Sequence, residues 1–360
     1  MIMPHLNRIG TAVPAHDIHA PFVGFARTLL RGLRTRLVFD RMAERSGIAH
    51  RYSFLRPGRL EAGEVDADFF YRRGAFPGTA ARMALYEPNA LHLALAAVAD
   101  LDIDTERDRI THLIVASCTG FTAPGLDLQL TERLGLRRDV ERTLIGFMGC
   151  SAAVPALRAA YHAVRSQPGA RALVVNLELS TLHLQETSDL ETVLSFLLFA
   201  DGAAAALVSG DETGLALDDF RAAVIPDSAS LITWRIGDQG FDMHLSGKVP
   251  SRIAAALRED LARGDPGGIL RGEGAQAVDV WAVHAGGRTV LDAVEIGLRL
   301  DASALQASRG VLRDFGNMSS ATVMFVLRRL LEAGGAGARG LTLAFGPGMV
   351  AETFRFRVAT

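Results

Sequence analysis

The sequence has little cysteine, few aromatic residues and almost no lysine. Two cysteines in 360 residues are too few for a disulfide framework, and no cysteine and histidine cluster has metal-ligand spacing. We therefore expect a protein of the reducing cytoplasm that binds no metal. No signal peptide and no uncharged run of about 20 residues is visible, so we expect neither secretion nor a membrane partner. A formal net charge of -2 argues against a nucleic-acid partner.

What the chain does contain is typical of a globular protein. Hydrophobic residues make up 49% of the sequence and aromatic residues only 7%, so alanine, leucine and valine supply most of the core. A chain of 360 residues is too long for one ordinary core. We therefore expect two domains or one duplicated domain.

Continuous apolar runs at residues 112–117, 172–177, 203–208, 278–283 and 341–345 read as strands covered on both faces. Segments with helical spacing separate them, which predicts a mostly parallel sheet with helices on its faces. A helix is also expected at 89–98, after Pro88. The boundary is placed in the polar stretch 210–214, which gives halves of 1–213 and 214–360 that repeat a similar strand-to-helix unit.

Cys150 stands where one such unit turns from strand to helix. The run 143–147 reads as a short buried strand, Gly149 turns the chain, and apolar residues then recur at helical spacing. Pro155 fits the first helical turn. Backbone N–H groups at a helix N-terminus favour a thiolate. The competing interpretation is a small buried structural cysteine.

Two further residues occupy similar places in the second half. His284 follows the strand 278–283, and Asn317 lies in a Gly-Asn pair that opens another helix. Alone, each is more often a structural histidine or a turn. Strand ends in open α/β sheets meet at one edge, so Cys150, His284 and Asn317 are expected to converge. Together they suit acyl-thioester chemistry, with Cys150 as nucleophile and the other two as donors to a developing oxyanion.

These motifs resemble the type III polyketide synthases, the chalcone-synthase-like branch of the thiolase superfamily. The matching stretches are Arg82-Met83 with Tyr86, residues 112–115, Pro124-Gly125, Gly149-Cys150, residues 200–205, His284 with Gly286-Gly287, and residues 316–321 and 345–348. The resemblance implies a thiolase-like duplicated βαβαβ fold with five αβαβα layers. It also implies a homodimer that uses free CoA thioesters, with no metal or other cofactor.

The resemblance assigns the substrate pocket by position. Phe199 matches a gate phenylalanine, whereas Met243 replaces its usual aromatic partner. Cys118 replaces a threonine, and Ala123 replaces a methionine that plant enzymes lend across the dimer. Glu178, His183 and Ser319 match further pocket positions, and we place CoA contacts at Arg51, Gly286 and Gly287. Asp201 is interpreted as part of a structural turn.

The smaller or more flexible residues Met243, Ala123 and Cys118 suggest room for an alkyl chain. The sequence therefore favours condensation of malonyl-CoA onto a fatty acyl-CoA, giving an alkylpyrone or alkylresorcinol. Alternatives are a naphthalene or phloroglucinol product from malonyl-CoA alone, a β-ketoacyl-carrier-protein synthase III, a papain-like cysteine hydrolase, and a silent binding paralogue. The cysteine's position mid-chain argues against the hydrolase.

Overall fold

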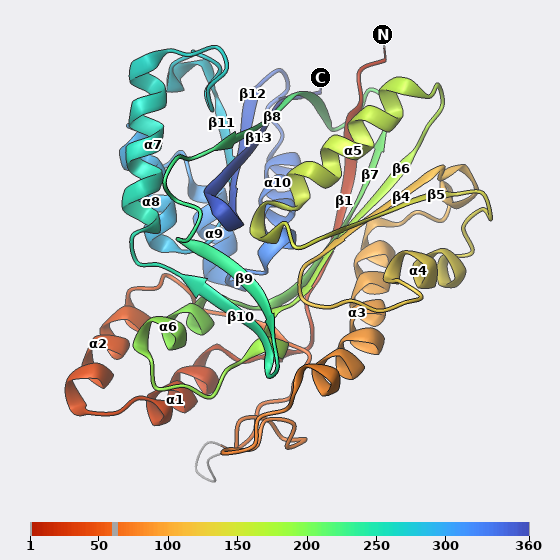
Figure 1. Cartoon of the computed structure of the whole chain (residues 1–360). Coiled ribbons are helices and arrows are strands. Elements are labelled where there is room, and N and C mark those ends of the chain that lie inside the picture. Colours follow the sequence, from red (N-terminus) through yellow and green to blue (C-terminus); the bar gives the residue numbers. More distant parts are fainter. Residues whose placement is uncertain (1, 60–63, 360) are drawn as a thin grey trace.

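The computed structural model describes residues 2–59 and 64–359, and its first part combines short strands with two helices (Figure 1). Strand β1 (His5–Ala12) opens the chain. It is followed by β2 (His16–Asp17), α1 (His19–Leu29), α2 (Leu33–Glu44) and β3 (Tyr52–Ser53). The two helices were not expected, because the arginines between residues 27 and 45 obscure their apolar positions.

One nine-stranded sheet runs through the described residues of both halves of the chain. Its other strands are β4 (His112–Ser117), β5 (Glu141–Gly146), β6 (Ala172–Leu179), β7 (Asp201–Ser209), β8 (Leu215–Val224), β11 (Val280–Val283), β12 (Arg339–Gly346) and β13 (Val350–Val358). Their order is β11-β12-β13-β8-β1-β7-β6-β4-β5. A separate hairpin joins β9 (Ile232–Gly237) to β10 (Gly240–Leu245). The predicted strands are therefore present.

The expectation of a mostly parallel sheet is wrong. Of the eight strand pairings described in this sheet, five are antiparallel and three are parallel. The apolar runs misled because a central antiparallel strand can also be covered on both faces, as β6 and β7 are. A continuous apolar run reports burial and not strand direction.

Helices divide the sheet into the layers that a thiolase-like fold requires. They are α3 (Thr79–Leu101), α4 (Leu126–Leu134), α5 (Ala153–Ser166), α6 (Leu190–Leu198), α7 (Val249–Arg263), α8 (Arg288–Leu298), α9 (Gln306–Phe315) and α10 (Thr322–Ala333). Side chains of α5 and α10 share one core with strands from both ends of the sheet. Helices α3 and α4 cover one outer face and α7 and α8 the other, which gives the order αβαβα (Figure 1).

Two local predictions need correction. Helix α3 begins at Thr79, ten residues before its expected start, and contains Pro88 in its interior. Burial of its side chains, with Tyr86 packed against β4 and Arg82 donating to the carbonyls of Leu182 and Leu184, outweighs the backbone hydrogen bond that proline cannot make. Asp201 does not form a turn: it is the first residue of β7 and is fully buried.

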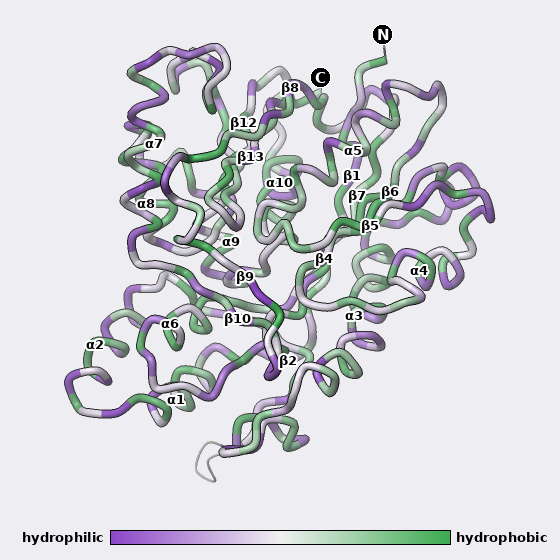
Figure 2. Tube along the Cα trace, in the orientation of Figure 1, coloured by the Kyte–Doolittle hydropathy of each residue, from purple (hydrophilic) through white to green (hydrophobic). Residues whose placement is uncertain are grey.

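Hydrophobic segments (green) run along the central strands, and hydrophilic segments (purple) form many of the outer turns (Figure 2). Strand β5 departs from this pattern, because it was expected to be buried and is instead the exposed edge of the sheet. Its Leu144 is 44% exposed.

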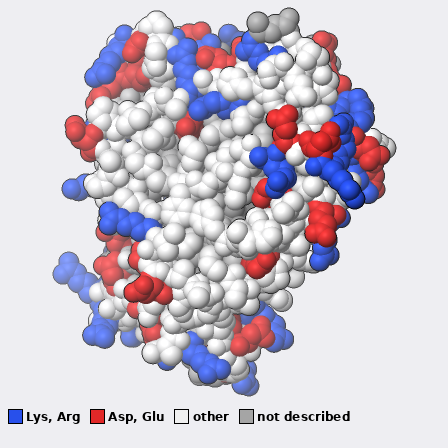
Figure 3. All heavy atoms as spheres, turned by 45° about the vertical axis from the view of Figure 1, so that its right-hand side comes forward, with Lys and Arg blue, Asp and Glu red and all other residues white. Residues whose placement is uncertain are grey.

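Charged side chains gather at the edges of the face seen in Figure 3 and leave its centre uncharged. Among the described residues, no helix is long and apolar enough to cross a membrane.

Candidate active site

Cys150 lies in a short 3-10 turn, Gly149–Ser151, that leads into α5. Gly149 has φ of +61°, and a Cβ there would lie 2.3 Å from Pro347 Cδ. The residue before the cysteine must therefore be glycine, both for its backbone conformation and for its close approach to the 347 segment. The structure thus confirms a cysteine at a glycine-preceded helix start, with its side chain lining a cavity.

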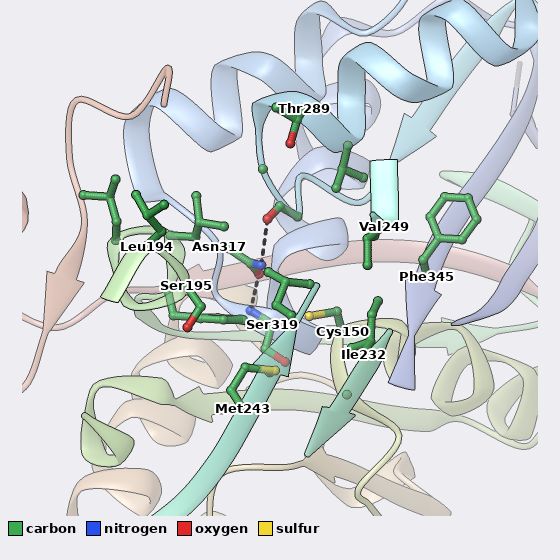
Figure 4. Close-up of a pocket in the computed structure, with 18 of the residues that line it drawn as sticks. Cys150, Leu194, Ser195, Ile232, Met243, Val249, Thr289, Asn317, Ser319 and Phe345 are labelled. Carbon is green, nitrogen blue, oxygen red and sulfur yellow. Dashed lines mark hydrogen bonds between the residues drawn. The ribbon is translucent and has the colours of Figure 1, made fainter. Parts of the chain in front are cut away.

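His284 and Asn317 reach the same cavity from the C-terminal half. The His284 backbone N–H donates to Leu343 O, but neither ring nitrogen has a hydrogen-bond partner among the described residues. Asn317 Oδ1 accepts from Ser319 N at 2.9 Å, and its Nδ2 donates to Gly286 O at 3.1 Å (Figure 4). The amide is therefore oriented by the main chain. The imidazole nitrogens remain available to a substrate.

Electrostatics at the site differ from the expectation of a ready thiolate. Burial raises the pKa of Cys150 to about 11, although hydrogen bonds from Ser319 and Asn317 lower it in part. Burial also lowers the pKa of His284 to about 4. Without substrate, the favoured state is a neutral thiol and a neutral imidazole in the same cavity. Thiolate and imidazolium would have to form together, because each charge then compensates the other.

A cavity of about 760 Å³ connects this group to the surface. Cys118, Cys150, His183, Trp234, His284, Asn317 and Ser319 line its inner part, and Leu198, Val249 and Ile253 are among its apolar lining residues. Met42, Arg45 and Arg288 also line it and carry exposed side chains, so they mark the mouth. The volume lies in the range of roughly 300–1,000 Å³ usual for small-molecule sites.

The structure brings most of the predicted pocket residues together. Phe199, Met243, Cys118, His183, Ser319, Gly286 and Gly287 all line this cavity. His183 is fixed on both sides: Nε2 contacts Thr119 O at 2.7 Å, and Nδ1 accepts from Phe241 N at 3.0 Å. Burial lowers its pKa to about 3, so it is a neutral wall of the cavity.

Glu178 and Ala123 lie elsewhere. Glu178 is fully buried behind the cavity lining, where its carboxylate accepts from Ser320 Oγ, Thr119 Oγ1 and Cys118 N. Burial nevertheless raises its pKa to about 7. The buried carboxyl group of Glu178 is therefore hydrogen-bonded to neutral donors and not paired with a cation. These hydrogen bonds support the wall of the pocket. Ala123 is exposed on the surface and does not line the chain's own cavity.

The structure does not support a CoA contact by Arg51. This side chain is 1% exposed, donates to the carbonyls of Phe196 and Phe199, and contacts His19 Nδ1 at 3.1 Å. It lines a separate cavity of about 60 Å³ behind Phe199. A basic residue near a turn suggested an anion site, but the guanidinium is used to hold the end of α6.

Several cavity residues were missed. Trp234 lies opposite Met243 in the β9–β10 hairpin. Its indole ring contacts the His183 ring edge-on, with 5.2 Å between the ring centroids, and its Nε1–H donates to Cys118 O. The alternating residues around Gly237 and Gly240 were a hairpin signal that would have placed Trp234 and Met243 on one face. Arg45 and Arg288 at the mouth, with Arg288 Nη1 donating to Arg45 O at 3.2 Å, had no comparable signal.

Comparisons with known proteins cover the whole site. Residues 6–212 match the N-terminal domain of chalcone and stilbene synthases, and residues 217–360 match their C-terminal domain. Bisdemethoxycurcumin synthase of Oryza sativa subsp. japonica is 34% identical over 332 residues, covering 87% of this chain and 81% of that protein.

Solved structures agree with this match over almost the full length. PKS-I from the brown alga Ectocarpus siliculosus is 30% identical, covers 99% of both chains and has a TM-score of 0.86. The 1,3,6,8-tetrahydroxynaphthalene synthase of Streptomyces coelicolor, a bacterial type III polyketide synthase, is 30% identical, covers 99% of both chains and has a TM-score of 0.85. The thiolase-like fold expected from the sequence is confirmed.

Proposed function

Because the chain belongs to the chalcone and stilbene synthase family, whose members are polyketide synthases and acyltransferases, we propose that it condenses malonyl-CoA onto a fatty acyl-CoA starter. The product is an alkylpyrone or an alkylresorcinol. The proposed chemistry needs no metal and no cofactor besides the CoA thioesters. One observation carries the proposal: a largely apolar cavity runs from an arginine-bearing mouth to Cys150, His284 and Asn317.

The first step loads the starter on Cys150. His284 accepts the thiol proton, the Cys150 sulfur attacks the thioester carbonyl, and the carbon–sulfur bond to CoA breaks. The proton on His284 then passes to the departing CoA thiolate. Imidazole nitrogens without a competing hydrogen bond can receive and return this proton.

The second step uses malonyl-CoA. Loss of its carboxylate as CO₂ leaves an enolate, whose oxygen gains negative charge. Asn317 is oriented with its amide nitrogen toward the Gly286 side, so that its second N–H is a donor, and the N–H of the neutral His284 ring is another. The enolate carbon then attacks the acyl group on Cys150 and releases the thiolate for the next round.

The mouth fits the phosphates of CoA. Arg45 and Arg288 are exposed there, and an arginine guanidinium binds phosphate oxygens in a bidentate manner. Gly286 and Gly287 line the passage between the mouth and His284, where the absence of side chains leaves room for a slender pantetheine arm. Arg45 and Arg288 thus replace Arg51 as our proposed CoA contacts, and Gly286 and Gly287 are kept.

The fatty starter is supported by the apolar lining around Cys150. Ile232, Met243, Leu245 and Leu194 face the cavity, and Met243 adapts its shape more readily than an aromatic ring. Each methylene buried against such side chains contributes roughly 0.8 kcal/mol. Affinity should therefore rise with starter length until the cavity is full.

A homodimer is the second part of the proposal. Phe121, Leu128, Leu144 and Met148 are all exposed and lie on or beside α4 and the edge strand β5. A large apolar patch beside an unpaired strand edge is typical of an interface. Ala123 lies in the same surface segment, which agrees with its expected place at the dimer wall.

The test is product analysis by mass spectrometry with malonyl-CoA and acyl-CoA starters of increasing length. We expect longer alkyl starters to be preferred, Cys150→Ala to be inactive, and Cys118→Ser to keep substantial activity as a matched control, because serine preserves the contacts of Cys118 with Gly149. A product from malonyl-CoA alone would favour the naphthalene or phloroglucinol alternative. A requirement for acyl carrier protein would favour a β-ketoacyl-carrier-protein synthase.

A further inference from the structure

The outward side of α2 carries large apolar side chains that contact little of the protein. Leu33 is 75% exposed, Leu37 is 52% exposed and Val38 is 39% exposed. Arg34 and Arg41 are exposed on the same side of the helix, between and beyond the leucines. We call these five residues the α2 face.

The α2 face is not needed to hold the helix in place. Phe39, on the opposite side of α2, is fully buried in a core with Val193 and Leu197 of α6. Ala43, one turn further on, packs against the same core. Since Phe39 and Ala43 already attach the helix, the exposed leucines leave apolar surface in water with no benefit to the fold.

The surroundings of the α2 face are strongly basic. Without Arg45, which is proposed above to bind CoA, residues 27–44 contain five arginines (Arg27, Arg31, Arg34, Arg36 and Arg41) and two carboxylates (Asp40 and Glu44), an excess of three positive charges. One carboxylate, Asp40, is paired with Arg27. The whole chain has a net charge of -2, so this concentration of positive charge is local. It complements an anionic surface.

The α2 face is continuous with the mouth of the active-site cavity. Met42 and Arg45, at the C-terminal end of the same helix, line that cavity. With a rise of 1.5 Å per residue, Leu33 lies about 14 Å from Met42 along the helix axis. Figure 1 shows α2 at the lower left corner of the molecule, beside α1 and α6 and away from the layers of the sheet. A surface bound by the leucines would therefore lie next to the mouth.

We propose that the α2 face binds the surface of an anionic lipid bilayer, with Leu33 and Leu37 inserted among the headgroups and the arginines on lipid phosphates. Helices that lie on membranes combine basic residues with leucines in this manner. This revises the expectation of no membrane partner, which considered only segments that span a bilayer. The purpose of the contact rests on the proposed function: a fatty starter and an alkyl product would pass between the bilayer and the mouth.

An acidic carrier protein is the competing occupant, and the shape of the α2 face favours lipid. Leu33 and Leu37 are exposed side chains that stand between arginines, and neither of them lines either of the two cavities described above. A bilayer surface deforms around separate protruding side chains, whereas a rigid partner helix needs a complementary groove.

The test is sedimentation of the full chain with vesicles of 70% phosphatidylcholine and 30% phosphatidylglycerol, compared with pure phosphatidylcholine. We expect binding to the anionic vesicles that weakens in 0.5 M salt. Leu33→Ser with Leu37→Ser should weaken it about tenfold or more per leucine, since each is a large apolar side chain. Arg34→Glu should weaken it as well. Ile296→Ser, at a residue on α8 that is 60% exposed, is the matched control and should bind as wild type.

Condensation with a short water-soluble starter should be unchanged in the double leucine variant, which shows that it folds. Failure to bind anionic vesicles, or equal binding by the double variant, would overturn the proposal. Retention of an acidic acyl carrier protein that the leucine variant abolishes, without vesicle binding, would identify a protein-docking surface instead. Vesicle binding needs no turnover, so it fails or succeeds independently of the proposed reaction.

Discussion

Replacing His284 by glutamine tests how Cys150 becomes nucleophilic. With its pKa raised by burial to about 11, the isolated thiol would be only about one part in 10⁴ thiolate at pH 7, since each pH unit below the pKa costs a factor of ten. Transfer of the proton to His284 creates an imidazolium that stabilises the thiolate. A positioned general base contributes about 10²–10⁴ in rate, so alkylation of Cys150 at pH 7 should slow by about that factor in His284→Gln.

The assay is the rate of iodoacetamide alkylation of Cys150 from pH 5 to 10, followed by mass spectrometry in a Cys118→Ser background. His244→Gln, at an exposed histidine outside the cavity, is the control and should follow wild type. Condensation should also slow by about 10²–10³ in His284→Gln if one oxyanion donor is misplaced. An unchanged alkylation profile in His284→Gln would refute the proton transfer and leave the N-terminus of α5 as the activator.

Three further results are expected. Glu178 has a raised pKa of about 7, so its protonated form stabilises the fold fully below about pH 4.5, and this contribution is lost as the pH rises through 7. The thermal unfolding midpoint of the wild type should therefore decrease from pH 5.5 to pH 8.5. The decrease should be smaller in Glu178→Gln, where Asp201, with a pKa of about 6, still titrates. Equal slopes would contradict this. Leu144→Arg should be a monomer by light scattering. Ile236, on β9, is 63% exposed, and Ile236→Arg is the control that should stay dimeric. A dimeric Leu144→Arg would exclude the β5 interface. Trp234→Ala should enlarge the inner cavity and shift products to higher mass, and unchanged products would show that the indole does not limit them.

That Cys150, His284 and Asn317 meet in one cavity could be predicted, because each of them stands at a change of structure that the sequence marks. Gly149 before Cys150, and Gly316 before Asn317, interrupt apolar runs where helices begin. His284 directly follows β11. These signals are local in the sequence. Parallel pairing of β11 with β12 and of β4 with β5 brings the C-terminal ends of the paired strands to the same edge of the sheet.

The depth of a side chain could not be predicted in the same way. Arg51 and Glu178 are both ionisable residues, yet Arg51 donates to main-chain carbonyls at the end of α6, and Glu178 accepts from donors in two separate segments. Each partner is more than 50 residues distant in sequence. Trp234 enters the cavity only because the β9–β10 hairpin folds over Cys118. Strand direction was also out of reach, since burial on two faces does not depend on it.

Phe199, the proposed gate, and Asn317, the proposed oxyanion donor, are joined through the main chain, although they come from different halves of the chain. Asn317 N donates to Leu198 O and Ala200 N donates to Asn317 O, both at 2.8 Å, so the two bonds flank Phe199 on either side. Side-chain changes at 199 therefore alter the width of the passage without releasing Asn317, because neither bond uses the phenylalanine ring. Under the proposed function, starter selection could therefore change at residue 199 without displacing the amide of Asn317. The structure supplies this separation through backbone hydrogen bonds, which substitutions at the gate leave intact.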